Sequence, residues 1–233
     1  MKIKALFPKS VKLKFRLILR FLSDRNINFA ESTILKEPFS NSISTIQEIK
    51  QGSFFENKVQ NIKNASIKVE SIIINPNQVF SFWRAVGPPT EKNGFKKGRN
   101  IINGKVSEEI GGGLCQISSI LYITSLKANL EILERHNHSV DIYKEEERFT
   151  PLGADATVVY GYKDLRVKNI NEFPIQFSFS YFENQIICKL ESLKKIDEKQ
   201  LDFIRNYKEK IIEVSTTINS IHYCLSTYQT MEL

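Results

Sequence analysis

Apolar residues recur at helical spacing in two stretches of the chain. Residues 55–70 place Val59, Ile62 and Ala65 on one face, which predicts a helix. Residues 114–130 contain neither glycine nor proline and are rich in Leu, Ile and Ala, a pattern typical of a buried helix. We expect this second helix to be the central element of the fold.

Runs of β-branched and aromatic residues bounded by turn residues predict strands. The segment 71–83 is expected to form two strands around a turn at 75–77, and the segment 100–110 a hairpin with a type I′ turn at 103–104. A helix followed by a run of strands favours an α+β fold, in which an antiparallel sheet packs on a central helix whose N-terminus carries Cys115. The further strands are predicted at 139–144, 155–162, 164–169, 174–182 and 184–191.

The remaining segments carry weaker patterns. Residues 26–55 are polar and predict irregular structure, and the charged segment 194–210 predicts a helix. With 41% hydrophobic residues, the 233-residue chain can bury a substantial core. We divide it into an N-terminal basic and helical segment (1–54), a central domain (55–192) and a C-terminal charged extension (193–233).

The formal charge of +7 is concentrated at the N-terminus. The chain has 33 Lys and Arg and 26 Asp and Glu; residues 1–25 hold eight of the basic residues and one acidic residue, which leaves 25 of each kind in the remainder. The basic residues form one helix-sized cluster without interleaved aromatic residues at a groove, so nucleic-acid binding is not expected.

A helix beginning near Pro8 would be amphipathic. One interpretation is a helix packed on the domain with its basic face in solvent; the other is an in-plane anchor on an anionic membrane surface. The sequence shows neither the apolar segment and cleavage site of a signal peptide nor a run of about 18 apolar residues, so the expected location is cytoplasmic or peripheral to the inner membrane face. The apolar side carries Val11, Phe15, Ile18 and Leu22, and a second side carries Lys12, Arg16 and Arg20.

Three cysteines without paired spacing do not indicate a disulfide framework, and we expect Cys188 and Cys224 to be structural. Cys115 differs because three glycines lead directly into it at the start of the predicted helix. The positive end of a helix dipole lowers the pKa of a thiol. Free backbone amides near such a thiol, together with the Gln116 side chain, are candidate oxyanion donors. The glycines are Gly111, Gly112 and Gly113.

A nucleophilic cysteine needs a base and a group that orients the base. His136 and His138 follow Cys115 by 21 and 23 residues, and in an extended segment both would point to the same face. Asp155, after a loop, is the candidate carboxylate. The order Cys, His, Asp is similar to papain-like and transglutaminase-like sites by analogy of arrangement only. The same side chains are acceptable zinc ligands, but no second cysteine stands at metal-ligand spacing, so neither a metal nor another cofactor is expected.

Between residues 75 and 179 the chain contains "FSFWRAVGP", then "GGGLCQISSILY" and "LEILERHNHS", and finally "PIQF". Together these blocks resemble the VanW family. The GGG-[LI]-CQ and ERH-x-HS blocks occur together in the order of the family, and the resemblance covers nearly half of the chain. The turn at 75–78 reads Asn-Pro-Asn-Gln, where the family commonly has Pro-Gly-Glu; none of the candidate catalytic residues is missing. The matching blocks are "FSFWRAVGP", "IINGK", "GGGLCQISSILY", "LEILERHNHS", "GADATVVYGYKDLRVKN" and "PIQF".

The resemblance implies an L,D-transpeptidase, because some VanW domains are implicated as cysteine acyltransferases that form 3-3 cross-links in peptidoglycan. Cys115 would attack the carbonyl between an L-centre and a terminal D-residue of a stem peptide or its precursor. His136 or His138 would then transfer the proton and Asp155 would orient that histidine. Water in place of an acceptor amine would make the enzyme an L,D-carboxypeptidase. One alternative is a non-catalytic module that binds cell-wall precursors, and another is an accessory protein. Each of these functions would link the chain to cell-wall remodelling or glycopeptide resistance.

Overall fold

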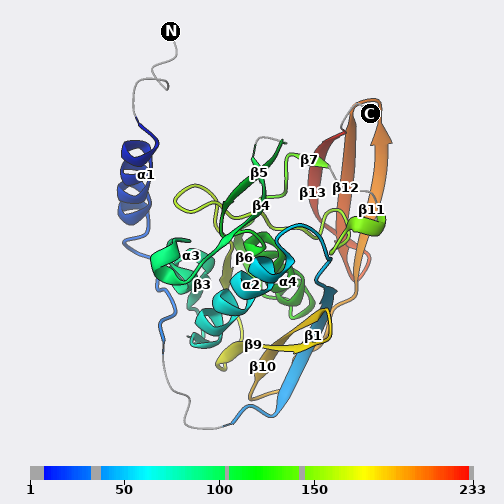
Figure 1. Cartoon of the computed structure of the whole chain (residues 1–233). Coiled ribbons are helices and arrows are strands. Elements are labelled where there is room, and N and C mark those ends of the chain that lie inside the picture. Colours follow the sequence, from blue (N-terminus) through cyan, green and yellow to red (C-terminus); the bar gives the residue numbers. More distant parts are fainter. Residues whose placement is uncertain (1–7, 33–37, 103–104, 142–144, 231–233) are drawn as a thin grey trace.

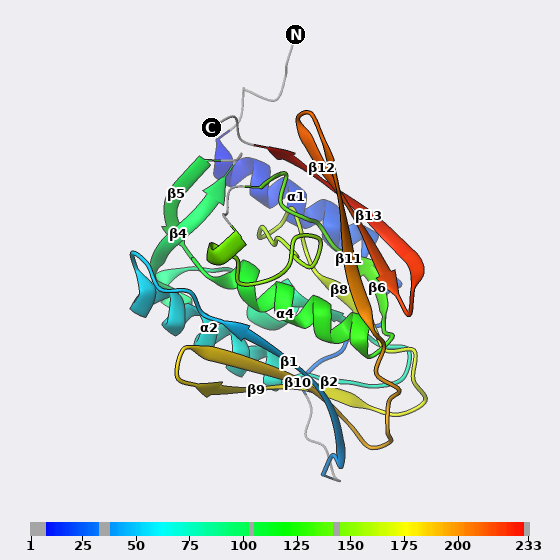
Figure 2. The ribbon, with the colours of Figure 1, turned by 90° about the vertical axis from the view of Figure 1, so that its right-hand side faces the viewer.

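The computed structural model describes residues 8–32, 38–102, 105–141 and 145–230 and confirms the α+β class. Helix α4 (Leu114–Lys127) lies at the centre of the ribbon (Figure 2). From Leu114 to Leu126, every residue of α4 except Cys115 is buried. A helix buried on all sides has no polar stripe, which explains why Leu, Ile and small hydroxyl residues are distributed all around it.

The sheet that packs on α4 has the strand order β1-β10-β9-β2 and is antiparallel throughout. Ile43 and Leu190 are paired across β1 and β10, and both are buried in the core. Helix α2 (Phe55–Glu70), predicted from its periodicity, packs beside this sheet and contacts both β9 and α4 (Figure 1). The strands are β1 (Asn41–Glu48), β2 (Ile73–Ile74), β9 (Ile175–Phe182) and β10 (Gln185–Ser192).

Two smaller antiparallel units accompany this sheet. One is the three-stranded sheet β3-β8-β6 and the other is the β4–β5 hairpin, which lies above the N-terminus of α4 in Figure 2. The predicted turn of this hairpin lies outside the described residues. The elements are β3 (Val79–Ser81), α3 (Phe82–Val86), η2 (Glu91–Asn93), β4 (Lys97–Ile102), β5 (Lys105–Ile110), β6 (Glu131–Glu134), β7 (Val140–Asp141), η3 (Glu145–Glu147) and β8 (Arg166–Lys168).

The C-terminal segment forms a sheet, so the prediction of a helix over 194–210 is wrong. Strands β11 (Leu201–Lys208), β12 (Ile211–Ile218) and β13 (Ile221–Thr230) pair antiparallel, and β13 also pairs in parallel with β7. The β-branched residues of β12 favour a strand over a helix. The charged segment β11 forms a strand because it pairs with β12. Asn219 and Ser220 both have positive φ, the conformation of a type I′ hairpin turn.

Two further expectations are corrected. The polar segment 26–55 contains β1, whose inward positions include Thr45 and Gln47, so the strand has no alternation of hydrophobic residues to reveal it. Residues 155–162 do not form a strand of any sheet; among them, Val159 makes one isolated bridge to Lys163. Of the strand predicted at 139–144, the structure shows β7, and residues 142–144 lie outside the described part.

Residues 155–162 remain outside a sheet because other groups take their backbone hydrogen bonds. Ser119 Oγ accepts from the amide of Ala156 at 2.9 Å, and Ser118 Oγ donates to the Ala156 carbonyl. The Thr157 amide donates to the His136 carbonyl at 2.7 Å. The segment is therefore laid across α4, directly beside the start of that helix.

The predicted N-terminal helix is α1 (Lys9–Ser23), which lies along the side of the body (Figure 1). Arg20 forms a bidentate ion pair with Glu134 at 3.0 and 2.7 Å, and Arg166 forms one with Asp24 at 2.8 Å for both bonds. Gly161, with φ +79°, lets the helix approach, because an added Cβ would lie 2.5 Å from Leu13 Cδ1. None of the described helices combines the length and the apolar character that crossing a membrane requires.

Candidate active site

Cys115 is the second residue of α4, and local packing accounts for the three glycines before it. Gly111 and Gly113 have φ values of +94° and +99°, which side chains disfavour. Gly112 lies against β4, where an added Cβ would be 2.6 Å from the Cα of Gly98. The glycines therefore let the loop turn tightly beneath the β4–β5 hairpin and bring the thiol to the start of the helix.

The turn before α4 leaves backbone amides available beside the thiol. The amides of Leu114 and Gln116 donate to the carbonyls of Gly111 and Gly113. Within the described residues, no acceptor takes a hydrogen bond from the amides of Gly113 or Cys115. Such donors at a helix N-terminus favour negative charge, so they can stabilise a thiolate or an oxyanion formed at this position.

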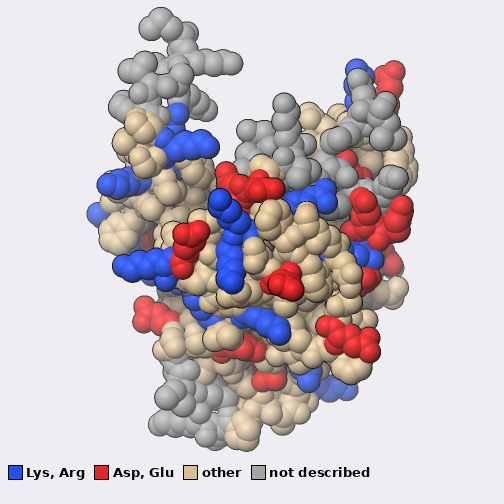
Figure 3. Space-filling model, viewed as in Figure 1, with Lys and Arg blue, Asp and Glu red and all other residues tan. Residues whose placement is uncertain are grey.

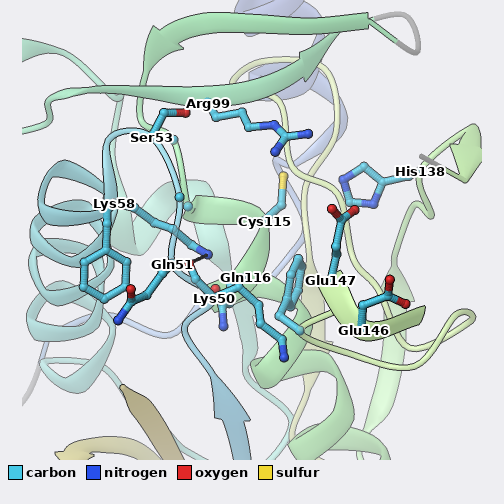
Figure 4. A pocket seen from close by; sticks show the side chains of 15 residues that line it. Lys50, Gln51, Ser53, Lys58, Arg99, Cys115, Gln116, His138, Glu146 and Glu147 are labelled. Carbon is cyan, nitrogen blue, oxygen red and sulfur yellow. Dashed lines mark hydrogen bonds between the residues drawn. The ribbon is translucent and has the colours of Figure 1, made fainter. Parts of the chain in front are cut away.

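The structure brings His138 and Asp155 together with Cys115. The Nδ1 atom of His138 lies 2.6 Å from Asp155 Oδ2, which also accepts the His138 backbone amide at 2.7 Å. The other ring nitrogen of His138 is therefore not engaged by Asp155, and the interaction with His138 is the strongest influence that lowers the pKa of the Cys115 thiol. Figure 4 shows the sulfur facing this imidazole. The sulfur also lies 3.6 Å from Thr157 Oγ1.

Electrostatics in the site favour the charged forms of all three groups. Burial opposes ionisation of Cys115, but the hydrogen bond and the charge of His138 outweigh it and lower the thiol pKa. Burial likewise opposes protonation of His138, while hydrogen bonds with Asp155 and Cys115 raise its pKa well above the ordinary value. Asp155 is buried, yet its bond to His138 lowers its pKa to about 2. The arrangement therefore favours a thiolate–imidazolium pair over the neutral pair.

Two other predicted site residues are engaged elsewhere. The Nε2 atom of His136 lies 3.0 Å from Glu134 Oε1, in the network that holds α1, so His136 does not share the site of His138. The Gln116 side chain is buried and its amide donates to the Glu48 carbonyl at 2.8 Å, at the end of β1. Gln116 thus connects the start of α4 to the sheet, and the backbone amides are the better placed oxyanion donors.

Sequence reasoning did not find the groups that hold Asp155. Arg135 donates to the Gly153 carbonyl at 2.8 Å, to Ser226 Oγ at 2.6 Å and to Asp155 Oδ1 at 3.3 Å. The Tyr228 hydroxyl donates to Asp155 Oδ1 and accepts the Gly153 amide at 3.0 Å. Ser226 and Tyr228 belong to β13, so the C-terminal sheet completes the surroundings of the carboxylate. No local sequence signal marks the contacts of Ser226 and Tyr228, because these residues lie 73 to 91 positions from their partners.

The thiol lies where two hollows meet. A cavity of about 290 Å³ on one side is shared by Cys115 and His138 with the cations Lys58 and Arg99. A second cavity of about 550 Å³ also borders Cys115 and His138 and extends toward aromatic side chains that include Tyr162. In Figure 4, Arg99 and Lys58 extend toward the thiol from β4 and α2. The two cavities together offer a groove on either side of the sulfur.

The loop at η3 forms another wall of the smaller cavity and is tied to the C-terminal sheet. Glu145 pairs with Arg205 of β11 through two bonds of 2.7 Å, and Arg148 pairs with Asp141. This fixes Glu147 and Phe149, which line the cavity. Throughout the described ranges, no three His, Cys, Asp or Glu side chains are grouped so that they could hold a metal ion.

Comparison with known proteins gives a consistent family assignment. The model of the family described as VanW like protein matches residues 57–191, which include Cys115, His138 and Asp155. The vancomycin B-type resistance protein VanW of Enterococcus faecalis is 32% identical over 156 residues, 64% of this chain and 57% of that protein. The uncharacterized protein YoaR of Bacillus subtilis is 31% identical over 144 residues, 62% of this chain and 46% of that protein.

The matched region thus spans about half the length of these curated relatives. No solved structure matches the chain significantly. The family match ends at residue 191, before β11, so the strand that supplies Ser226 and Tyr228 lies beyond it. The match covers more than half of the chain and contains the thiol, the imidazole and the carboxylate in one segment, and the protein therefore belongs to the VanW family.

Proposed function

We propose that the protein is a cysteine acyltransferase that acts on peptidoglycan stem peptides, as an L,D-transpeptidase or an L,D-carboxypeptidase. The observation that carries the proposal is the Cys115–His138–Asp155 chain at the start of a buried helix, with the thiol open to a groove on both sides. The relative named for vancomycin B-type resistance supports a substrate from the cell wall.

In the first half-reaction, the Cys115 thiolate attacks the carbonyl carbon between an L-centre and a terminal D-residue. The new C–S bond places negative charge on the carbonyl oxygen, which the amides near Gly113 and Cys115 can stabilise. His138 donates its proton to the leaving amine as the C–N bond breaks. The products are a thioester on Cys115, a free D-amino acid and a neutral His138.

In the second half-reaction, an acceptor amine attacks the thioester. His138 accepts a proton from the amine, an amide bond forms, and the thiolate leaves to restore the initial ion pair. Water in place of the amine yields a carboxylic acid by the same route. Asp155 keeps the Nδ1 side of His138 hydrogen-bonded throughout, which fixes the ring so that its other nitrogen serves the reacting groups.

The cations beside the thiol suit a peptide that carries carboxylates. Burial, together with the charge of Arg99, lowers the pKa of Lys58 to about 8. Lys58 remains mostly protonated at neutral pH, and a bound carboxylate would stabilise its charged form. Stem peptides contain free carboxylates, so we assign the smaller cavity to the donor peptide and the larger one to the acceptor.

The test is intact-protein mass spectrometry after incubation with a tetrapeptide donor that ends in a D-residue. The proposal predicts an adduct with the mass of the tripeptidyl group, located on Cys115, and an equal amount of free D-amino acid. Cys115→Ala abolishes both products, whereas Cys224→Ala, which removes the other partly exposed thiol, leaves them unchanged.

The same samples distinguish the binding-module alternative. Donor peptide that binds wild type and Cys115→Ala equally in calorimetry, with no adduct and no released D-amino acid, would replace the acyltransferase proposal with a non-catalytic role. Release of the D-amino acid without an amine acceptor identifies the carboxypeptidase. A new peptide–peptide amide in the presence of the acceptor identifies the transpeptidase.

A further inference from the structure

The most apolar side of α1 faces away from the protein. Leu13 and Leu17 contact the body at Gly161, whereas Phe15 and Ile18 on the opposite side are 60% and 56% exposed. The helix has no buried residue, although it is held at its C-terminal end by the ion pairs of Arg20 and Asp24. The exposed apolar residues, which we call the outer face of α1, are Val11, Phe15, Ile18, Leu19, Phe21 and Leu22.

Among the described residues, none covers the outer face of the docked helix. An amphipathic helix on a globular domain normally turns that stripe toward the core. Here the ion pairs of Arg20 and Asp24 and the close contact at Gly161 fix the opposite orientation. A continuous group of large apolar side chains on the surface marks an interaction site.

The charges on α1 identify the kind of partner. The sequence of α1 contains basic residues and no acidic residue. Arg20 is paired with Glu134, but in the described part of the chain Lys9, Lys12 and Lys14 have no ion-pair partner. Lys12 and Lys14 lie on the two flanks of the outer face, where their long side chains can reach past the apolar residues. Figure 3 shows the blue side chains gathered over this helix.

We propose that the outer face of α1 lies in the surface of an anionic membrane, with the helix axis in the membrane plane. Apolar side chains at the centre and lysines at both flanks are the pattern of an in-plane helix, in which the apolar face enters the acyl boundary and the lysines contact anionic headgroups. A second copy of the chain is a poor occupant, because two such faces would bring two sets of unpaired lysines together.

Sedimentation of the full chain with vesicles tests this proposal. We expect binding to vesicles of equal parts phosphatidylglycerol and phosphatidylcholine, and much weaker binding to phosphatidylcholine alone. Phe15→Ser/Ile18→Ser lowers binding about tenfold or more, because both side chains lose their burial in the acyl region. Lys9→Gln/Lys12→Gln/Lys14→Gln reduces binding to anionic vesicles and removes its salt dependence.

A matched control removes exposed apolar residues elsewhere. Ile67 of α2 and Ile221 of β13 are 67% and 73% exposed, so Ile67→Ser/Ile221→Ser deletes comparable apolar surface away from α1 and should bind like wild type. Equal loss in both double variants, or equal binding to both kinds of vesicle, would overturn the proposal.

Oligomeric state supplies the competing outcome. The protein could instead fail to bind vesicles and form a dimer that the Phe15→Ser/Ile18→Ser substitutions dissociate. In that case the outer face of α1 is an interface between two copies of the chain, and the membrane proposal is wrong. The proposal does not depend on thiol chemistry, so Cys115→Ala must bind vesicles like wild type.

Discussion

Replacing Tyr228 with Phe tests whether the C-terminal sheet supports the candidate site. The hydroxyl donates to Asp155 and accepts the Gly153 amide, and Tyr228 and Asp155 are only 1% and 6% exposed. A hydrogen bond to a charged group contributes about 1.5–3 kcal/mol, and a buried amide without a partner costs about 1–3 kcal/mol. We therefore expect Tyr228→Phe to lower the free energy of unfolding by about 3 kcal/mol.

The assay is urea unfolding at neutral pH, with Tyr181→Phe as the matched control. The Tyr181 hydroxyl donates to Ser66 Oγ at 2.7 Å, a neutral partner that keeps its bond to the Ile62 carbonyl. Removing that hydroxyl should therefore cost about 1 kcal/mol. Equal free energies of unfolding for the two variants would refute the argument that Tyr228 holds a buried carboxylate.

Tyr228→Phe should also change how the stability of the protein depends on pH in acid. The pKa of Asp155 is held below its ordinary value in part by the Tyr228 hydroxyl. A carboxylate with a lowered folded-state pKa stabilises the protein above its unfolded-state pKa and loses that contribution as the pH falls through the folded-state value. With the hydroxyl gone, the folded-state pKa of Asp155 rises toward the unfolded-state value, so the acid loss of stability should be smaller, and complete at a higher pH, in Tyr228→Phe than in Tyr181→Phe.

Three further predictions concern stability and reactivity. The folded-state pKa of Asp155 is about 2. In wild type, Asp155 therefore adds about 2 kcal/mol to the free energy of unfolding above about pH 4, and this contribution is lost between about pH 4 and 2. Denaturant titrations across this range should show a smaller loss in Asp155→Asn. Gly112→Ala should destabilise the fold by about 1–3 kcal/mol because its Cβ would collide with Gly98, whereas Gly52→Ala, which has no atom within 4 Å of the added Cβ, should be close to neutral in the same unfolding assay. Burial raises the pKa of the fully buried Cys188 thiol to about 12, so peptide mapping should find Cys188 unmodified by iodoacetamide until the protein is unfolded; its modification in the native protein would contradict the structure.

The elements with a clear period could be predicted from the sequence. The helical spacing in α2, the uninterrupted apolar run of α4 and the turn-bounded strands β9 and β10 each carry a local signal that the tertiary structure preserves. Strand β1 could not be predicted, because its buried positions include polar Thr45 and Gln47. Strand β11 could not be predicted either, since its charged sequence becomes a strand only by pairing with β12.

The candidate site likewise contains some residues that the sequence could predict and others that it could not. The triglycine turn, Cys115 and the downstream His and Asp are local features, and the sequence indicates them. The choice between His136 and His138 depends on Glu134, which takes His136 into the network beneath α1. Tyr228 approaches Asp155 only through the packing of β13, so no spacing within the sequence reveals it.

The pH dependence of Cys115 alkylation decides whether this residue is a thiolate paired with protonated His138. In a Cys188→Ser/Cys224→Ser background, we predict half-maximal iodoacetamide reactivity well below the free-thiol value of about 8.5. His138→Ala should move the midpoint to that value or above it, because the two largest influences that lower the thiol pKa are lost while burial still raises it. His136→Ala should leave the midpoint unchanged. Identical profiles for wild type and His138→Ala, or a shift produced by His136→Ala alone, would show that His138 does not activate the thiol.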